Sequence, residues 1–340
     1  MRKALAITVV FVLMSLGGLC QAVVIGTVPV GDPGNLADTE SMADGTTGYG
    51  SVGYVYSIGK YEITAGQYTE FLNKVATTDS YGLWNFSMGS QPYACKIQRN
   101  GSSGSYTYSV AADWANRPVN YVSYWDACRF ANWMHNGQPS GRQNSLTTED
   151  GAYTLNGYNG TDGLAIQRNV GARWYIPSEN EWYKAAYYTG GGTDAGYWDY
   201  PTQSDTSPSN QVLPTDPGNS ANYYTTTYSI DGPYWRTEAG EFENSGSAYG
   251  TFDQAGNVWE WNEGVLRVSG AYTSRCFRGG SFISDASYLH ASARPTVFIF
   301  PTYEHYVMGF RIAGAVPEPS SFLALGSGLL VLAGTVRRKR

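Results

Sequence analysis

The chain has 340 residues, of which 42% are hydrophobic and 15% aromatic, with a formal net charge of −6. This length and apolar content suffice for one large domain or two small ones, and they exclude extensive disorder. Basic residues gather at the two ends, where residues 1–22 and 337–340 contain no acid, so the remaining body is more acidic still, which excludes nucleic acid as an expected partner.

The first 22 residues have the parts of a secretory signal peptide. Arg2 and Lys3 supply the positive charge, Ala4–Leu19 is apolar, and the small residues of Cys20-Gln21-Ala22 predict cleavage after Ala22. We expect signal peptidase to remove this segment during export. An uncleaved N-terminal anchor is the alternative.

The first helix of the domain is predicted from a capping motif. Residues 23–51, rich in Gly, Asp, Thr and Pro, are expected to form a loosely structured lead-in, and residues 52–313 the domain itself. A strand is expected over Tyr54–Ile63. Thr64-Ala65-Gly66-Gln67 then has the form of a capping box, so a helix is expected to follow through Val75. Residues 81–115 predict loops and a hairpin.

Two more helices are predicted further along the chain. Ser123 is the expected N-cap of the second, which should stop at Asn136-Gly137. Residues 147–156 predict two strand-like runs around a turn at Asp150-Gly151. Ser178 and Glu181 form a second capping box, and that helix is expected to run to the glycines at 190–192.

The remainder of the domain is expected to be irregular. Residues 189–241 form a long polar stretch, which is typical of a functional or ion-bound loop, and short strands are expected from there to residue 313. Three modest helices among short strands lack a βαβ rhythm, so a doubly wound sheet is excluded and an irregular α+β domain is predicted.

The C-terminal segment, residues 316–340, has three parts. These are Pro317-Glu318-Pro319, the uncharged run Ser321–Val336, and the basic cluster Arg337–Arg340. The uncharged run is at the short end for a bilayer core of ~30 Å, and the basic cluster is expected on the cytoplasmic side. A generic tail anchor is one interpretation. The three parts together resemble the PEP-CTERM sorting signal of Gram-negative bacteria. That resemblance implies transient anchoring in the inner membrane through a C-terminal helix, cleavage by an exosortase, and release or attachment at the cell surface.

Several blocks of the chain resemble one protein family. They are Ile58–Thr64, Pro118–Trp133, Ile176–Ala186, Gly256–Trp261 (GNVWEW), Arg278–Phe282 (RGGSF) and Gly309–Arg311 (GFR). In this order they resemble the sulfatase-modifying factors, the family of the formylglycine-generating enzymes. The resemblance covers roughly Val52–Ala313 and implies an irregular variant of the C-type-lectin-like fold.

The family's catalytic positions are altered in this chain. The active enzymes oxidise a substrate cysteine to formylglycine with oxygen, using two cysteines that bind copper(I), a soft ion that thiolates suit. Here the two positions are Ser284 and Leu289. Cys276 precedes the Gly-Gly-Ser block, and Cys95 and Cys128 belong to distant segments. The sequence therefore argues against copper and assigns no catalytic residue. The three cysteines allow at most one disulfide, whose pairing stays open.

The residues give little support to two other chemistries. Related nonheme-iron enzymes supply three histidines, whereas His135, His290 and His305 are scattered along this chain. Ser284 beside Asp285, with His290 nearby, invites a hydrolase interpretation, but no GxSxG elbow accompanies them and spacing alone cannot place a triad.

The resemblance also implies two calcium sites. The first comprises Asn222, the carbonyl of Tyr223 and Asp231, with Pro233 as a weaker carbonyl position. The second comprises the side chains of Asp253 and Glu260 with the carbonyls of Gly256 and Val258. Calcium takes six to eight oxygen ligands, which a turn with inward-facing groups can provide. Solvated turn residues are the alternative.

Three hypotheses for function remain open at this level. The first is an exported, non-catalytic, calcium-stabilised binding or structural module at the cell surface or outside the cell, with an extracellular polysaccharide or a surface protein as partner. The second is an active oxidase of the formylglycine-generating type. The third is a lectin-like glycan binder, because the Tyr-rich segments Tyr187–Tyr200 and Tyr223–Tyr234 could line a groove.

Overall fold

An antiparallel sheet joins the two ends of the domain. In the computed structural model, which describes residues 22–193, 195–270 and 272–316, its strand order is β1 (Thr27–Val30), β2 (Tyr56–Gly59), β9 (Ala313–Ala315) and β5 (Trp174–Tyr175). Strand β1 belongs to residues 23–51, so the expectation of a loosely structured lead-in was wrong there. Its partner is β2, and β2 is shorter than the strand predicted over residues 54–63.

The three predicted capping motifs begin the three longest helices. These are α1 (Ala65–Val75), α4 (Tyr124–His135) and α5 (Glu179–Tyr187), which begin after Thr64, Ser123 and Ser178. In each, the cap side chain accepts from the backbone N–H three residues on, and the side chain there accepts from the cap N–H. Each box therefore satisfies two backbone donors that the helix leaves unpaired. Helix α5 ends before the glycines that were expected to stop it.

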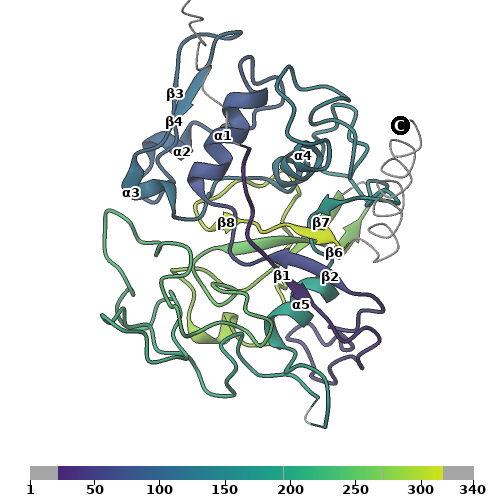
Figure 1. Ribbon diagram of the computed structural model, residues 1–340, viewed down its shortest axis with the longest axis vertical. Helices are drawn as coiled ribbons and strands as arrows, with labels where there is room; N and C mark the ends of the chain where they lie inside the picture. The colour runs from purple at the N-terminus through teal and green to yellow at the C-terminus, as the bar shows by residue number, and fades with distance from the viewer. Residues whose placement is uncertain (1–21, 194, 271, 317–340) are drawn as a thin grey trace, which may run out of the picture.

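The segment between α1 and α4 contains the predicted hairpin. It comprises β3 (Gln98–Asn100) and β4 (Thr107–Ser109), flanked by the short helices α2 (Ser87–Ser90) and α3 (Ala112–Ala115). These elements lie with α1 and α4 in the upper half of Figure 1.

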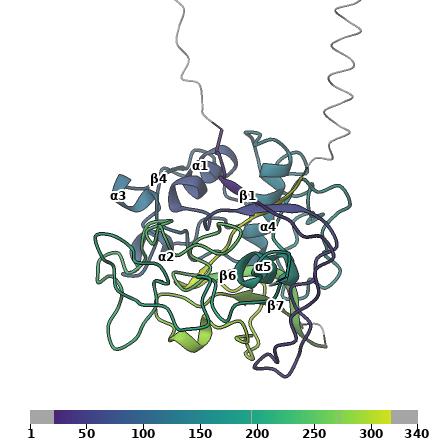
Figure 2. The same ribbon diagram turned by 60° about the horizontal axis from the view of Figure 1, so that its bottom comes forward.

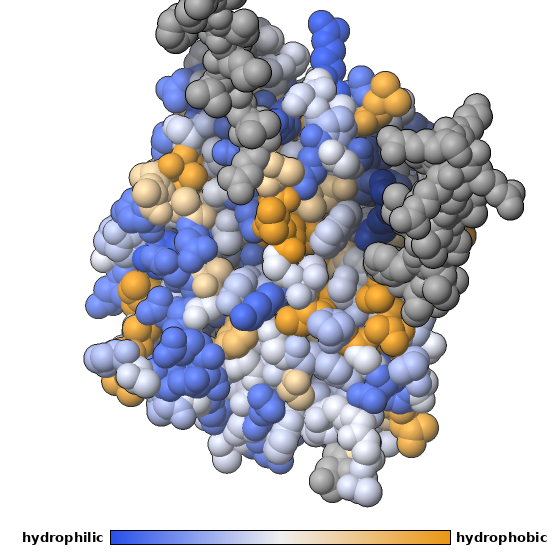
Figure 3. Space-filling view, in the orientation of Figure 1, coloured by the Kyte–Doolittle hydropathy of each residue, from blue (hydrophilic) through white to orange (hydrophobic). Residues whose placement is uncertain are grey.

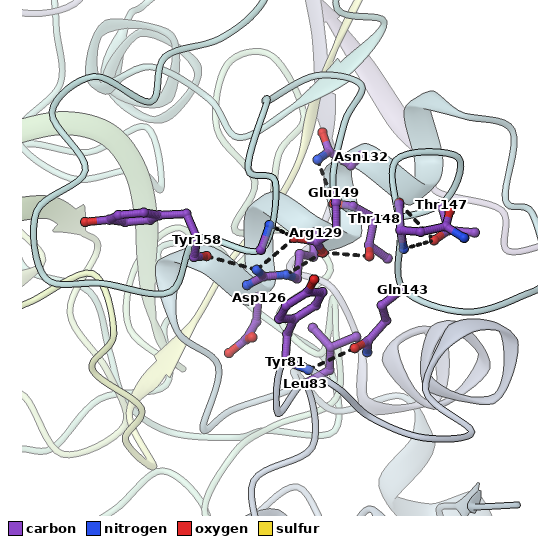
Figure 4. A network of polar contacts seen from close by, with 12 residues as sticks. Tyr81, Leu83, Asp126, Arg129, Asn132, Gln143, Thr147, Thr148, Glu149 and Tyr158 are labelled. Atoms are coloured by element: carbon purple, nitrogen blue, oxygen red, sulfur yellow. Dashed lines mark hydrogen bonds and ion pairs between the residues drawn. The ribbon is translucent and has the colours of Figure 1, made fainter. Parts of the chain in front are cut away.

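Residues 147–156 form no strand, contrary to the prediction. They wrap around α4 because its buried polar side chains need partners (Figure 4). Arg129 donates from Nε and Nη2 to the two carboxylate oxygens of Glu149, at 2.8 and 3.0 Å. Asn132 Nδ2 donates to the carbonyls of Thr148 and Tyr153. In this segment the hydrogen bonds and the ion pair with buried side chains of α4 stabilise the chain more than a local strand would.

A three-stranded sheet crosses the middle of the molecule. Its order is β7 (Tyr272–Arg278), β6 (Trp259–Ser269) and β8 (Met308–Gly309), with β8 parallel to β6. The β6–β7 hairpin is longer than the short strands expected there. A single 3₁₀ turn, η1 (Ala286–Tyr288), follows β7. Residues 189–193 and 195–255 form irregular loops in the lower half of Figure 1, and Figure 2 shows them beside α5.

Buried aromatic residues hold these loops and helices together. Trp125, Trp133, Trp182 and Trp261 are fully buried, as the sequence predicted, whereas Trp259 is partly exposed. In Figure 3 the apolar residues on the visible face are scattered among polar ones in small groups. Among the described residues no helix is long and apolar enough to cross a membrane. The predicted signal peptide and sorting tail lie almost entirely outside the described residues.

Candidate functional site

The two signature blocks meet at a pair of tightly placed glycines. Gly256 has φ +81°, and a Cβ there would lie 2.1 Å from the carbonyl oxygen of Asn222. The Gly256 N–H donates to the carbonyl of Gly279 at 2.7 Å, and Phe282 N donates to Asn257 O at 3.0 Å. Only glycine fits such a backbone approach, so these residues place the GNVWEW and RGGSF blocks side by side.

A buried ion pair ties three blocks to each other. Arg311 donates from Nε and Nη2 to the two carboxylate oxygens of Glu260 at 2.5 and 2.6 Å, and Trp182 Nε1 donates to Glu260 at 2.6 Å. All three side chains are fully buried. The GFR motif, helix α5 and the GNVWEW block therefore form one structural unit.

Beside this unit lies a cavity of about 690 Å³. Trp259 and Phe277 line it from β6 and β7, Ser284 and Tyr288 from the segment around η1, and His305 from the loop before β8. The remaining lining is mostly aliphatic, with a few hydroxyl groups and the charged side chains of Asp285 and Arg294. A cavity of this size and mixed lining is suited to binding a small molecule or part of a larger one.

The two catalytic positions of the family are in different surroundings. Ser284 lines the cavity, and its Oγ accepts a hydrogen bond from Ser281 N at 3.0 Å. Leu289 is fully buried in an apolar cluster with Ala221 and Tyr223, and is not among the residues that line the cavity. The first position therefore offers a hydroxyl oxygen, and the second has become part of the core.

The cysteines supply no thiolate to the cavity. Cys95, Cys128 and Cys276 are all buried and form no disulfide. Burial raises the pKa of each thiol, so each stays protonated at neutral pH.

The histidines and Ser284 do not assemble a triad. His290 Nδ1 lies 2.8 Å from Ser292 Oγ and also accepts from Ser292 N, while its Nε2 is 3.5 Å from Asp199. Asp285 instead caps the turn at Ser287. The hydrolase arrangement of Ser284, Asp285 and His290 is therefore not formed.

The first predicted calcium site contains a buried oxygen without a partner. Asn222 Nδ2 donates to Trp235 O and Asn257 Oδ1, but Oδ1 of Asn222 is buried with no hydrogen bond. The neighbouring carbonyl of Tyr223 receives only bonds of 3.3 Å. Asp231 and Pro233 are exposed. Buried oxygens normally have a partner, and an unpaired amide oxygen beside a weakly bonded carbonyl is a pair of ligands that calcium could use.

The second predicted site adjoins the first but differs in its oxygens. Asn222 and Gly256 form a parallel bridge, which brings the two segments together, and Val258 is buried close by. Asp253 accepts from Gly240 N at 2.7 Å, and desolvation raises its pKa to about 6. The oxygens of Glu260 are already held by Arg311 and Trp182. Of the two sites, the first has the free oxygen.

Sequence reasoning missed one acid in this region. Glu62 is 2% exposed, neither of its carboxylate oxygens has a partner, and burial raises its pKa well above the usual range. The Asp253 and Glu260 carboxylates raise it further. Its position between Tyr61 and Ile63 in a strand-like run gave no signal of this burial. Among the residues that the structure describes, no group of three or more His, Cys, Asp or Glu side chains is arranged around a metal position.

Fold and motifs together define an irregular C-type-lectin-like domain of the formylglycine-generating-enzyme type. Residues 37–316 match the family described as sulfatase-modifying factor enzyme 1-like domain, and residues 315–340 match the PEP-CTERM protein-sorting motif. The chain belongs to the sulfatase-modifying factor enzyme 1-like family and carries a PEP-CTERM sorting signal.

Three solved structures that the chain matches share little sequence with it. CarF is 20% identical over 86% of this chain and 99% of its own, with a TM-score of 0.48. Treponema denticola variable protein 1 is 20% identical over 85% and 95%, with a TM-score of 0.47. PvdO from Pseudomonas aeruginosa is 18% identical over 86% and 92%, with a TM-score of 0.44. No curated protein matches the sequence.

Proposed function

We propose that this protein is an exported ligand-binding domain that does not generate formylglycine. The observation that carries the proposal is the fate of the two catalytic positions: Ser284 lines the cavity and Leu289 is buried in the core. Copper(I) needs soft ligands, and neither a hydroxyl nor a leucine side chain is one. The cavity has a volume of about 690 Å³, which is enough space for a bound molecule. The two catalytic positions of the family supply no soft ligand for copper there.

Export follows from the sorting signal. A PEP-CTERM motif implies processing by an exosortase, and the predicted signal peptide implies prior cleavage by signal peptidase. We place the mature domain at the cell surface or outside the cell. An extracellular polysaccharide or a surface protein is then the available kind of partner.

Calcium is proposed as a structural ion of the 221–235 loop. Asn222 Oδ1, the Tyr223 carbonyl and Asp231 would hold it, and it would supply the partner that the buried Asn222 oxygen lacks. A second ion would use Asp253 with the carbonyls of Gly256 and Val258. Glu260 could join only by leaving Arg311, so we assign the first site the greater affinity.

The alternative that the domain is an oxidase has a direct test. The purified mature protein is titrated with copper(I) under anaerobic conditions and then incubated with a sulfatase-derived cysteine peptide and oxygen. We expect neither stoichiometric copper nor formylglycine. A family member that has both cysteines serves as the positive control, and copper bound one-to-one by this protein would overturn the proposal.

A further inference from the structure

A row of aromatic rings runs from the first predicted calcium loop to the cavity. We call it the aromatic row, and its members are Tyr224, Tyr228, Trp235, Tyr93, Tyr306 and Tyr303. Successive ring centroids lie 5.0, 4.8, 5.2 and 5.1 Å apart from Tyr224 to Tyr306. The His305 ring then joins Tyr306 to Tyr303, at 4.0 and 5.3 Å, and both His305 and Tyr303 line the cavity.

The row is partly open to solvent along its whole length. Tyr303 is 37% exposed, and the other members are partly buried. All six residues lie in loops outside the strands of the structure. The row and the cavity therefore form one continuous surface, which the loops at 91–94, 221–235 and 301–307 build.

The tyrosine hydroxyls of the row differ from those in the core. Buried Tyr56, Tyr68 and Tyr223 each donate to a backbone carbonyl, at 2.5, 2.8 and 2.5 Å. Within the described part of the chain, the hydroxyls of the row tyrosines take part in no such bond. A buried phenol needs a protein partner, whereas these hydroxyls remain available to a ligand.

The charged side chains of this surface do not favour an anionic ligand. The exposed Asp285 lines the cavity and would repel one. Arg294 lines the cavity, but its guanidinium is held by Glu179 and Asp44. Arg236, next to Trp235, is fully buried and donates to the carbonyls of Tyr93 and Ala94. Because Arg294 and Arg236 are both bound to groups of the protein itself, neither offers its charge to a polyanion.

We propose that the aromatic row and the cavity bind an uncharged glycan chain. The C–H faces of sugar rings would stack on the aromatic faces, and sugar hydroxyls would exchange hydrogen bonds with the free phenol groups and with the serine hydroxyls of the cavity. A peptide is the competing occupant. A peptide that adds a strand to a sheet edge gains affinity through main-chain hydrogen bonds, and this surface presents side chains from loops instead. The inference rests on the proposed function, in which the cavity binds a ligand and performs no oxidation.

Affinity electrophoresis of the mature protein in gels containing laminarin, mannan, dextran or alginate tests the inference. We expect retardation by at least one of the three neutral polysaccharides and none by alginate. Tyr228→Ala and Tyr303→Ala should each weaken binding about fivefold, since each removes one stacking contact. The corresponding Phe variants should bind with intermediate affinity, because they keep the ring and lose the hydroxyl.

Tyr234→Ala is the matched control. Tyr234 lies in the same loop, but its hydroxyl donates to Asp113 and its ring packs on Trp114, away from the row. This variant should bind like the unchanged protein, and thermal melts should show that all variants are folded. Absence of binding to every neutral polysaccharide, binding to alginate alone, or selection of peptides from a library without glycan binding would overturn the inference. Copper binding and formylglycine formation are measured separately. A protein that binds neither glycan nor copper would contradict only this inference. A protein that binds glycan and also forms formylglycine would contradict only the proposed function.

Discussion

At the scale of single residues, burial raises the pKa values of two neighbouring carboxyl groups, those of Glu304 and Asp126. Asn85 donates to Glu304 at 2.5 Å, and Asp126 accepts from the N–H and the hydroxyl of Ser123. Burial, followed by the nearby Asp126 charge, raises the pKa of Glu304 to about 9, while burial raises that of Asp126 to about 6. The folded protein therefore holds a proton on Glu304 that the unfolded chain releases near its usual pKa of 4.5.

The raised pKa of Glu304 predicts that the protein loses stability as the pH rises from 4.5 to about 9. The contribution of Glu304 is fully present below pH 4.5 and is lost as the pH rises towards 9, because over that window only the folded state keeps the proton. Glu304→Gln should remove this dependence, so the unchanged protein should lose stability relative to the variant by up to about 1.4 kcal/mol for each pH unit between pH 4.5 and about 9. Urea unfolding at several pH values measures this, with the exposed Asp285→Asn as control. Parallel pH profiles for Glu304→Gln and the unchanged protein would show that the carboxyl is already ionised when folded.

Arg311 supports a second prediction at this scale. Its removal leaves Glu260 charged, fully buried and without a cation, which typically costs about 3–5 kcal/mol. Arg311→Leu should therefore lower the free energy of unfolding by that amount in urea. Arg267→Leu, which changes an exposed arginine on β6, should have little effect. A loss below about 1 kcal/mol would mean that the pair is structurally dispensable.

At the scale of elements, the helices were the part that the sequence predicted well. A capping box is a local signal, and each of Thr64, Ser123 and Ser178 begins the helix expected of it. The prediction of strands in residues 147–156 was wrong because the conformation of this segment depends on Arg129 and Asn132, which lie outside it. Strand β1 was missed for a similar reason, since its partner β2 comes more than twenty residues later.

In the candidate site too, features set by nearby residues could be predicted, and features set by residues distant in sequence could not. The position of Ser284 followed from the Gly-Gly-Ser block, but the burial of Leu289 in a separate cluster depends on how residues 200–223 fold back. Glu62 was missed because the charges that act on its carboxyl group, those of Asp253, Glu260 and Arg311, are distant in sequence. The aromatic row joins three loops, so no single segment reveals it.

At the scale of the whole molecule, calcium is expected to stabilise the loop-rich half. At a hundredfold excess over its Kd, one ion would add about 2.7 kcal/mol, or a rise in Tm of about 5 °C. Chelator should lower the Tm by the same amount. Asn222→Ala removes the orphaned oxygen and should abolish the difference, while Glu243→Gln, an exposed acid elsewhere, should keep it. Identical melts with and without chelator would count against bound calcium, and a full shift in Asn222→Ala would place the ion elsewhere.

We propose that this domain binds a ligand in its cavity and does not generate formylglycine. The glycine contacts and the Glu260–Arg311 ion pair hold the signature blocks together. The two positions where the active enzymes bind copper carry Ser284 and the buried Leu289. The most direct measurement is mass spectrometry of a sulfatase-derived cysteine peptide after incubation with copper(I)-treated protein and oxygen. Unchanged cysteine, beside full conversion by a family member with both cysteines, is the predicted result, and formylglycine in the peptide would contradict the account.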